Sequence, residues 1–275
     1  MTKLPRHFWK DMTTADFSAS DTSDWIAVLP VAAIEQHGPH LPVSTDATIN
    51  EGLIAAMLAK LPADLPVTVL PMQTLGKSDE HIHSPGTLTL GYDTLVRVLT
   101  EIGESVARAG IRKLVLANSH GGNIAVNDIV ARALRLRCDM LCVSASWARF
   151  GQPAGLFTEF EQQFGIHGGE METSVMLALA PDRVVMSKAR TFASLQETLV
   201  KKHKQLRAHG ANAFGWIAQD LNPEGTVGDA GLATAAKGQQ SIGHMTECFI
   251  ELLQDMHAFD LNTLWSATEA GNLRE

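Results

Sequence analysis

Residues 25–42 read WIAVLPVAAIEQHGPHLP, and they set the class of fold. Trp25–Ile34 carries no charge and few polar atoms, which is typical of a strand buried on both faces of a parallel sheet. We expect this strand to deliver Glu35 and His37 at its end. Side chains two apart on an extended chain point to the same side, so these two share a pocket while Gln36 points away.

Asp46 adds a second carboxylate to this region. It precedes Ala47–Lys60, whose apolar spacing is helical, so we expect Asp46 near a helix N-terminus, where a carboxylate is favoured. Neighbouring buried carboxylates repel each other unless a cation lies between them, so the cluster suits a divalent metal. These residues alone leave an alternative open, namely a capping Asp46, a surface Glu35 and histidines bonded to backbone carbonyls.

Length and composition limit the class of protein. The 275 residues are 45% hydrophobic, enough for one core, and we expect a single domain over residues 1–275. A net charge of −8 argues against nucleic acid as a partner. The sequence shows neither a signal-peptide core nor a membrane-spanning apolar run, so we expect a cytoplasmic protein with no membrane partner. Three cysteines lack metal-site spacing and are assigned to packing.

The rest of the chain alternates between strand and helix patterns, which predicts a parallel sheet covered on both faces. Right-handed crossovers bring the loops after the strands to one edge, where ligands of open α/β folds bind. The further strands are expected at Val67–Pro71, Lys113–Asn118 and Met140–Ala145. The further helices are expected at Tyr92–Ala109, Ile124–Leu136, Met171–Ala180, Ser194–His209 and Leu232–Phe259.

A second polar segment, Asn118–Asn123, follows one of these strands. His120 at the strand end, with Gly121 and Gly122 behind it, offers another metal-binding position. The alternative is an anion-binding or nucleotide-binding module without catalysis, because glycine-rich turns before helices bind phosphates through backbone N–H groups. A third spaced glycine is missing, however, so the phosphate signal is weak.

A third polar segment, His167–Ser174, opens a helix. Glu170 and Glu172 are two apart and diverge on a helix, so at most one faces the pocket. Alone, these residues fit an ordinary acidic helix start. Together with the other two segments, one of these glutamates completes a set of five ligands, enough for two metal ions that share a bridging carboxylate.

These segments in this order resemble the creatininase (creatinine amidohydrolase) family. The resemblance implies a three-layer α/β/α sandwich with a mostly parallel sheet, a homo-oligomer that is often a hexamer, and a binuclear centre that hydrolyses C–N bonds other than ordinary peptide bonds. It rests on residues 35–42 with Thr45-Asp46, Ser78 with Glu80-His81, Pro85-Gly86-Thr87, residues 118–123 and residues 167–174, with a weaker echo at residues 225–238.

Carried over by position, the resemblance makes Glu35 and His120 ligands of one metal, His37 a ligand of the other, and Asp46 the bridge. Creatininase itself has a glutamate where this chain has Gly122. Relatives with the His-Gly-Gly-Asn form use the glutamate of a Glu-Thr-Ser triplet, so the resemblance favours Glu172 over Glu170 as the fifth ligand. The two ions would be zinc with zinc, manganese or iron at the second site.

The resemblance also implies a mechanism and substrate contacts. A hydroxide that bridges the metals would attack the amide carbonyl, with His167 as catalytic acid or base and Glu172 beside it. Substrate contacts would come from Ser78, Glu80, His81, Gly121 and Trp147. Residues 161–166 lack the tryptophan that packs on the substrate ring in creatininase, which disfavours creatinine itself.

The leading hypothesis is therefore a metal-dependent amidohydrolase that acts on a small cyclic amide or a related small-molecule amide. The alternatives within the family are a formamidopyrimidine deformylase and a peptidase for modified peptides.

Overall fold

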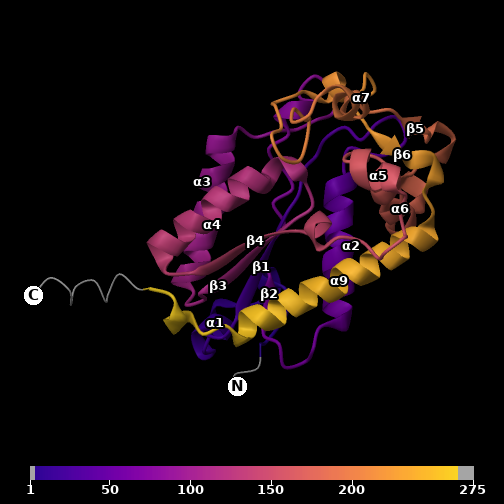
Figure 1. Cartoon of the computed structure of the whole chain (residues 1–275). Helices are drawn as coiled ribbons and strands as arrows, with labels where there is room; N and C mark the ends of the chain where they lie inside the picture. Colours follow the sequence, from indigo (N-terminus) through magenta and orange to yellow (C-terminus); the bar gives the residue numbers. More distant parts are fainter. Residues whose placement is uncertain (1–3, 266–275) are drawn as a thin grey trace, which may run out of the picture.

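The computed structural model describes residues 4–265 and is built around a four-stranded parallel sheet with strand order β2-β1-β3-β4. Helices cover both faces, so the predicted three-layer α/β/α architecture is confirmed (Figure 1). The strands are β1 (Ile26–Val31), β2 (Val67–Val69), β3 (Lys113–Asn118), β4 (Leu141–Ser146) and an antiparallel pair, β5 (Thr191–Phe192) with β6 (Gly228–Asp229). The helices are α1 (Thr14–Ala19), α2 (Thr45–Lys60), α3 (Tyr92–Arg108), α4 (Ile124–Cys138), α5 (Glu159–Phe164), α6 (Glu170–Leu179), α7 (Leu195–Lys202), α8 (Ala218–Leu221) and α9 (Ala235–Ala258).

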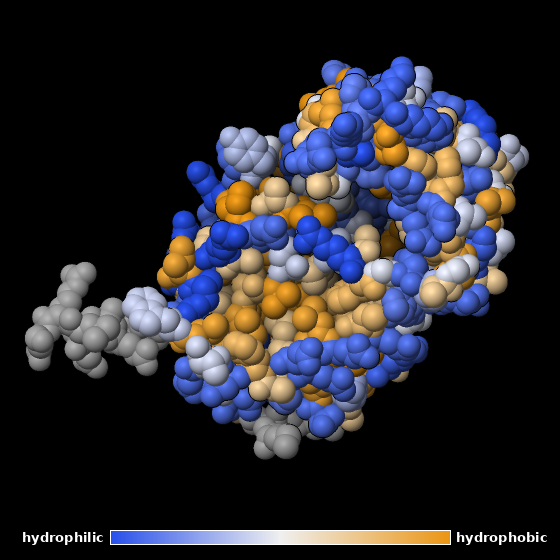
Figure 2. All heavy atoms as spheres, viewed as in Figure 1, coloured by the Kyte–Doolittle hydropathy of each residue, from blue (hydrophilic) through white to orange (hydrophobic). Residues whose placement is uncertain are grey.

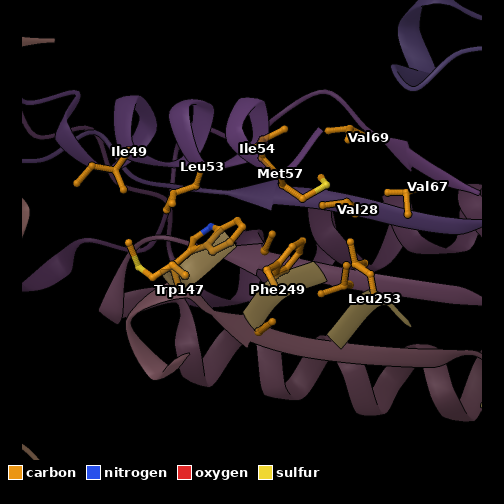
Figure 3. Packing of buried hydrophobic residues seen from close by; sticks show 14 of the residues in the cluster. Val28, Ile49, Leu53, Ile54, Met57, Val67, Val69, Trp147, Phe249 and Leu253 are labelled. Atoms are coloured by element: carbon orange, nitrogen blue, oxygen red, sulfur yellow. The ribbon is translucent and has the colours of Figure 1, made fainter. Parts of the chain in front are cut away.

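Side chains of the central strands alternate between two hydrophobic cores. Ile26 and Val28 of β1 pack in the core with α2, α6 and α9, whereas Ala27 and Leu29 pack in the core with α3 and α4. Figure 3 shows the first core, where Val28 lies among side chains of α2 and α9. Both faces of β1 are therefore buried, which explains why its sequence is apolar throughout.

The order of the strands reverses between β1 and β3. From β1 the chain passes through α2 to β2 on one side, whereas β3 lies on the other side of β1 and continues through α4 to β4. Ligands of open α/β sheets bind in the crevice at such a reversal. The segments that follow β1 and β3 carry Glu35, His37 and His120, so the topology brings these residues to that crevice.

Strand β1 is shorter than the predicted Trp25–Ile34. Its pairing with β3 ends at Val31, and Ala32 then donates its N–H to the Gln73 carbonyl (2.9 Å). The carbonyl of Ala32 accepts from the Asn123 side chain (3.0 Å). The apolar composition of the sequence does not show that the strand ends at Val31, because residues 32–34 stay buried or half-buried after the pairing with β3 has ended. Glu35 therefore follows the strand instead of ending it.

The long helix expected at Ser194–His209 is wrong, because α7 ends at Lys202. The chain then turns back on α7, where the Ala208 N–H donates to Gln196 Oε1 (2.7 Å). Gly210 and Asn212 have φ angles of 83° and 58°, outside the helical region. Leu199 of α7 packs in a small apolar cluster with Ala208 and Val227, so these tertiary contacts, and not the helical pattern, decide the path after Lys202.

The other predicted elements lie close to the observed ones, and β3 matches the predicted range. Helix α5 and the β5–β6 pair were not anticipated. Among residues 4–265, no helix is long and apolar enough to cross a membrane.

Asn50 of α2 joins the ends of the two strands that frame the crevice. Its Nδ2 donates to the carbonyls of Val31 (3.0 Å) and Ala117 (2.9 Å), and its Oδ1 accepts from Trp147 Nε1 (3.2 Å). Asn50 is fully buried, so water cannot replace these partners.

We predict that Asn50→Ala lowers the free energy of unfolding by about 2–4 kcal/mol, because it leaves buried polar groups unpaired. Urea unfolding followed by circular dichroism measures this change. Gln239→Ala, at an exposed position of α9, is the control and should change stability by less than about 0.5 kcal/mol. Equal stability of the two variants would show that Asn50 does not hold the strand ends.

Candidate metal centre

Glu35 lies at the centre of the crevice with its carboxylate between histidines. Its Oε2 lies 3.2 Å from His120 Nε2, and its Oε1 lies 3.3 Å from His81 Nε2 and 3.6 Å from His167 Nδ1. The side chain is fully buried, and neither oxygen has a partner that meets hydrogen-bond geometry. A carboxylate held in this way needs positive charge close by.

Asp46 lies in the first turn of α2, between two further histidines. Its Oδ1 is 3.5 Å from His37 Nε2, and its Oδ2 is 3.4 Å from His120 Nδ1. The carbonyl of Asp46 accepts from Ser119 Oγ (2.9 Å), which ties the start of α2 to the segment after β3. The two oxygens of one carboxylate therefore face two different imidazoles.

The structure separates the two competing glutamates of α6. Glu172 Oε2 lies 3.9 Å from His37 Nε2 and accepts from the Gly168 N–H (2.6 Å). Glu170, itself buried, forms an ion pair with the partly exposed Lys237 of α9. Glu172 thus joins the cluster, whereas Glu170 serves the packing of α6 on α9, and the role of Glu172 as a metal ligand stays a prediction.

Gln36 does not point away from the site as expected. The Gly38 N–H donates to its Oε1 (2.9 Å), which directs its Nε2 toward His81 Nδ1 (2.8 Å). The backbone carbonyl of Gln36 accepts from His167 Nε2 (2.7 Å). The chain beyond β1 turns at Gly38 (φ 73°) and is not a regular extended strand, so alternation fails here.

The residues predicted to contact substrate lie in different surroundings. Glu80, His81 and Gly121 line a cavity of about 450 Å³ together with Glu35, Asp46, His120, His167 and Glu172. Ser78 is buried behind it, with its Oγ 3.5 Å from His120 Nε2. Trp147 lies in the hydrophobic core, 2% exposed and packed on Phe249, and it lines a neighbouring cavity that shares Glu172. Its role toward substrate stays a prediction.

Sequence reasoning missed two residues that line the 450 Å³ cavity, His209 and Trp216. Both belong to the segment after α7 that was partly assigned to a helix. Gly210 and Asn212 follow the predicted helix directly and indicate that the chain continues as a loop, but no such signal marks its actual end at Lys202.

The pKa values in the cluster follow from burial and from the mixture of charges. Burial opposes the charge on His37, but Asp46, Glu172 and Glu35 outweigh it and raise the pKa of His37 to about 10. Burial would likewise raise the pKa of Glu35, yet the positive charge of His120 holds it well below its usual value. Burial and the positive charge of His37 lower the pKa of His167 well below its usual value. His167 is therefore neutral at pH 7.

The donor set fits two cations. Within residues 4–265, three groups of possible ligand atoms lie within 4.8 Å of one another: Glu35 with His37 and His167, Glu35 with Asp46 and His120, and His37 with Asp46 and Glu172. Buried atoms without a hydrogen-bond partner include both Glu35 oxygens, His37 Nε2 and Asp46 Oδ2. Oxygen and imidazole donors of this kind suit zinc, manganese and iron.

The surroundings of the Gly121–Gly122 turn argue against the anion-binding alternative. A Cβ atom placed on Gly122 would meet Glu80 Oε1 and His120 Nε2 at 2.4 Å, so an acidic side chain already lies against this turn. Glu35 and Asp46 lie on the same cavity and repel an anion further.

The sequence matches the creatininase family, described as creatinine amidohydrolase, over residues 10–253. The chain belongs to the creatininase family. It is 31% identical over 224 residues to the mycofactocin precursor peptide peptidase of Mycolicibacterium smegmatis, covering 80% of this chain and 81% of that protein. It is 30% identical over 194 residues to the creatinine amidohydrolase of Pseudomonas putida, covering 66% of this chain and 75% of that protein.

Solved creatininases share the fold. A crystal structure of creatinine amidohydrolase (creatininase) superposes with a TM-score of 0.73 at 23% identity, over 93% of this chain and 100% of that chain. A further solved relative, described as "Creatininase Mn", gives a TM-score of 0.71 at 24% identity, over 92% of this chain and 99% of that chain. This creatininase-family chain is therefore a hydrolase of the amidohydrolase type, and its buried donor groups are consistent with dependence on metal.

We predict that metal uptake by this creatininase-family protein releases protons. The pKa of His37 is raised to about 10, and neighbouring carboxylates raise that of His120 well above its usual value despite burial, so both are protonated at pH 7 without metal. Metal ligation requires neutral imidazole, so zinc loading at pH 7 should release about two protons per chain from these rings, with a further fraction of a proton from Glu172, whose pKa burial raises to about 7, and loading should weaken as pH falls.

Calorimetry of zinc binding in buffers of different ionisation enthalpy measures the proton count. His37→Ala should release about one proton fewer, whereas His83→Ala, at an exposed position, should behave as the parent protein. Tight loading with no net release would contradict ligation by His37 and His120.

Proposed function

We propose that the chain is a binuclear metal-dependent hydrolase that cleaves the C–N bond of a small cyclic amide or a related amide. The observation that carries this proposal is the position of Asp46, whose two oxygens face His37 and His120 at 3.5 and 3.4 Å. A carboxylate whose two oxygens each face a different metal-binding histidine is positioned to bridge two metal ions.

The residues divide into two sets around Asp46. Glu35 and His120 would hold one ion, and His37 and Glu172 the other, with Asp46 common to both. We propose zinc at one position and zinc, manganese or iron at the second, since oxygen and imidazole donors accept each of them. When bound, such ions polarise the amide carbonyl and lower the pKa of water so that it attacks near neutral pH.

His167 is proposed to move the proton. Its Nε2–H donates to the Gln36 carbonyl at 2.7 Å, so in the neutral ring Nδ1 carries the lone pair. Nδ1 faces Glu35 and can take a proton from water as the C–N bond is attacked. The same ring then gives that proton to the leaving nitrogen, so water and amide become carboxylic acid and amine.

Gln36 is proposed to set the orientation of the histidine pair. Its Nε2 donates to His81 Nδ1, so the other nitrogen of His81 presents its N–H to Glu35 Oε1 at 3.3 Å. His81 can therefore orient Glu35 through this N–H, or contact substrate. His167 remains the histidine with a free lone pair for proton transfer.

Peptide cleavage is the second candidate. It is favoured by the 31% identity to a precursor peptide peptidase over 80% of this chain. A panel of cyclic amides, formamidopyrimidines and short peptides, assayed with zinc-loaded and manganese-loaded protein, separates the candidates. Turnover of the cyclic amides supports the first candidate, and turnover of peptides alone supports the second.

We predict that the purified protein carries up to two divalent metal ions per chain and that Asp46→Asn costs at least about tenfold more activity than Glu35→Gln, because Asp46 serves both ions. Elemental analysis and the rate on the best panel substrate measure both effects. Equal losses in two variants that still bind both metals would contradict the bridging role.

We predict that Glu172→Gln loses the ion held with His37 and nearly all turnover. The matched variant Glu170→Gln should keep both ions and most activity, because Glu170 pairs with Lys237 away from the cluster. That variant should unfold about 1–3 kcal/mol more easily, since it weakens an ion pair whose carboxylate is buried. If Glu170→Gln lost an ion and Glu172→Gln kept both, Glu170 and not Glu172 would be the metal ligand on α6.

The chain is further proposed to form a homo-oligomer, with a hexamer as the expected size. β4 is the edge strand of the central sheet, and its side chains Leu141 and Val143 are only half-buried. Figure 2 shows apolar side chains across the face where β4 and α9 lie in Figure 1. Such a face is typical of an association surface. Sedimentation should give a multiple of the 29.7 kDa chain mass, whereas a monomer at micromolar concentration would contradict assembly.

Cytoplasmic location stays a prediction.

A further inference from the structure

The segment 203–217 adds two side chains to the cavity of the metal cluster. His209 and Trp216 line the same 450 Å³ space as Glu35, His120 and Glu172. In Figure 1, α7 and the loop after it lie above the end of the central sheet where the crevice opens. Figure 2 shows that the surface is hollowed beneath this part of the molecule. The cavity is therefore walled partly by sheet loops and partly by this segment.

Internal contacts hold the segment in one conformation. Ala208 is buried, its N–H donates to Gln196 Oε1 (2.7 Å), and its carbonyl accepts from Trp216 Nε1 (2.7 Å). The Phe214 N–H donates to the Arg207 carbonyl (3.2 Å), which closes the turn around residues 208–213. His209 follows Ala208 directly, so its backbone is positioned before any ligand binds.

His209 differs from the other histidines of the cavity. His81, His120 and His167 each lie within 4 Å of Glu35, whereas His209 Nε2 is buried and has no hydrogen-bond partner. Buried polar atoms of native proteins are nearly always paired, and His209 lines the cavity, so a ligand in the cavity could supply the partner that Nε2 lacks.

We propose that His209 is a substrate-binding residue whose Nε2 forms a hydrogen bond to a second carbonyl oxygen of the amide substrate, remote from the bond that is cleaved. The inference rests on the proposed function and deepens it, because it specifies an amide that carries a second acceptor group. Trp216 would provide the apolar wall beside that group, since its Nε1 is already used by Ala208.

The charges around the cavity favour His209 as the donor of this hydrogen bond and the substrate oxygen as the acceptor. Burial lowers the pKa of His209, so its ring is neutral at pH 7 and carries one N–H. The carboxylates of Glu35, Asp46 and Glu172 line the same space, and their negative charge favours an N–H over a lone pair on a ring nitrogen that is turned toward the cavity. Trp216 and Glu80 also line an adjoining hollow of about 330 Å³, which leaves room for a substituent beyond the amide.

The test is His209→Ala in metal-loaded protein, assayed on the best panel substrate. We expect KM to rise about tenfold or more with kcat changed far less and metal content unchanged, because a binding contact is lost and no ligand is removed. His209→Gln should recover part of the loss, since its amide keeps a donor. His203→Ala, an exposed histidine of the same segment, is the control and should leave KM unchanged. Parent values of KM and kcat in His209→Ala, or loss of metal from that variant, would overturn the proposal.

A second measurement separates this inference from the proposed function. In zinc-loaded protein, the imidazole ¹⁵N signal of His209, identified by its loss in His209→Ala, is followed during titration with N-acetylglycinamide as a neutral probe with two amide carbonyl oxygens. A saturable shift is expected. If the parent protein hydrolyses no amide, the proposed function fails, and His209 is then judged by this titration alone. An unmoved His209 signal while the signals of the cluster histidines shift would overturn the proposal.

Discussion

Electrostatic repulsion among three neighbouring carboxylates, two of them buried and one half-buried, is the constraint on which the site depends. Glu35 and Asp46 are almost completely buried, and Glu172 lies with them around His37. Isolated charges in such surroundings are costly unless positive charge compensates them. Here imidazole nitrogens lie 3.2–3.9 Å from carboxylate oxygens, and several of these buried atoms have no hydrogen-bond partner. Without metal the carboxylate charges are therefore only partly compensated, whereas two bound cations would compensate them.

Neutral amides hold this arrangement in place. Asn50 bonds to the ends of β1 and β3, Asn123 bonds to Ala32 just beyond β1, and Gln36 connects Gly38 to His81. None of these groups adds charge to the cluster, yet each fixes the backbone or the ring from which a ligand extends. Ligands from four separate segments can therefore meet at the reversal of strand order, even though the segments lie far apart in the sequence.

Much of the architecture follows from the sequence because the buried strands are long enough to show continuous apolar composition. The run at Lys113–Asn118 defines β3, and the three polar segments lie after strands or at helix starts. The choice of Glu172 over Glu170 came from a family resemblance, since helical spacing shows only that the two diverge. The orientation of Gln36 was not predictable, because it depends on the turn at Gly38 and on contacts with His81. The path of residues 203–217 depends on Gln196 and Trp216, which local patterns do not connect.

We propose that Asp46 is shared by two metal ions in this creatininase-family hydrolase. Anomalous diffraction from crystals of zinc-loaded protein, measured on both sides of the zinc absorption edge, shows the positions of the ions. We expect two anomalous peaks, one beside Glu35 and His120 and one beside His37 and Glu172, with one oxygen of Asp46 bound to each. A single peak, or two peaks of which only one contacts Asp46, would contradict it.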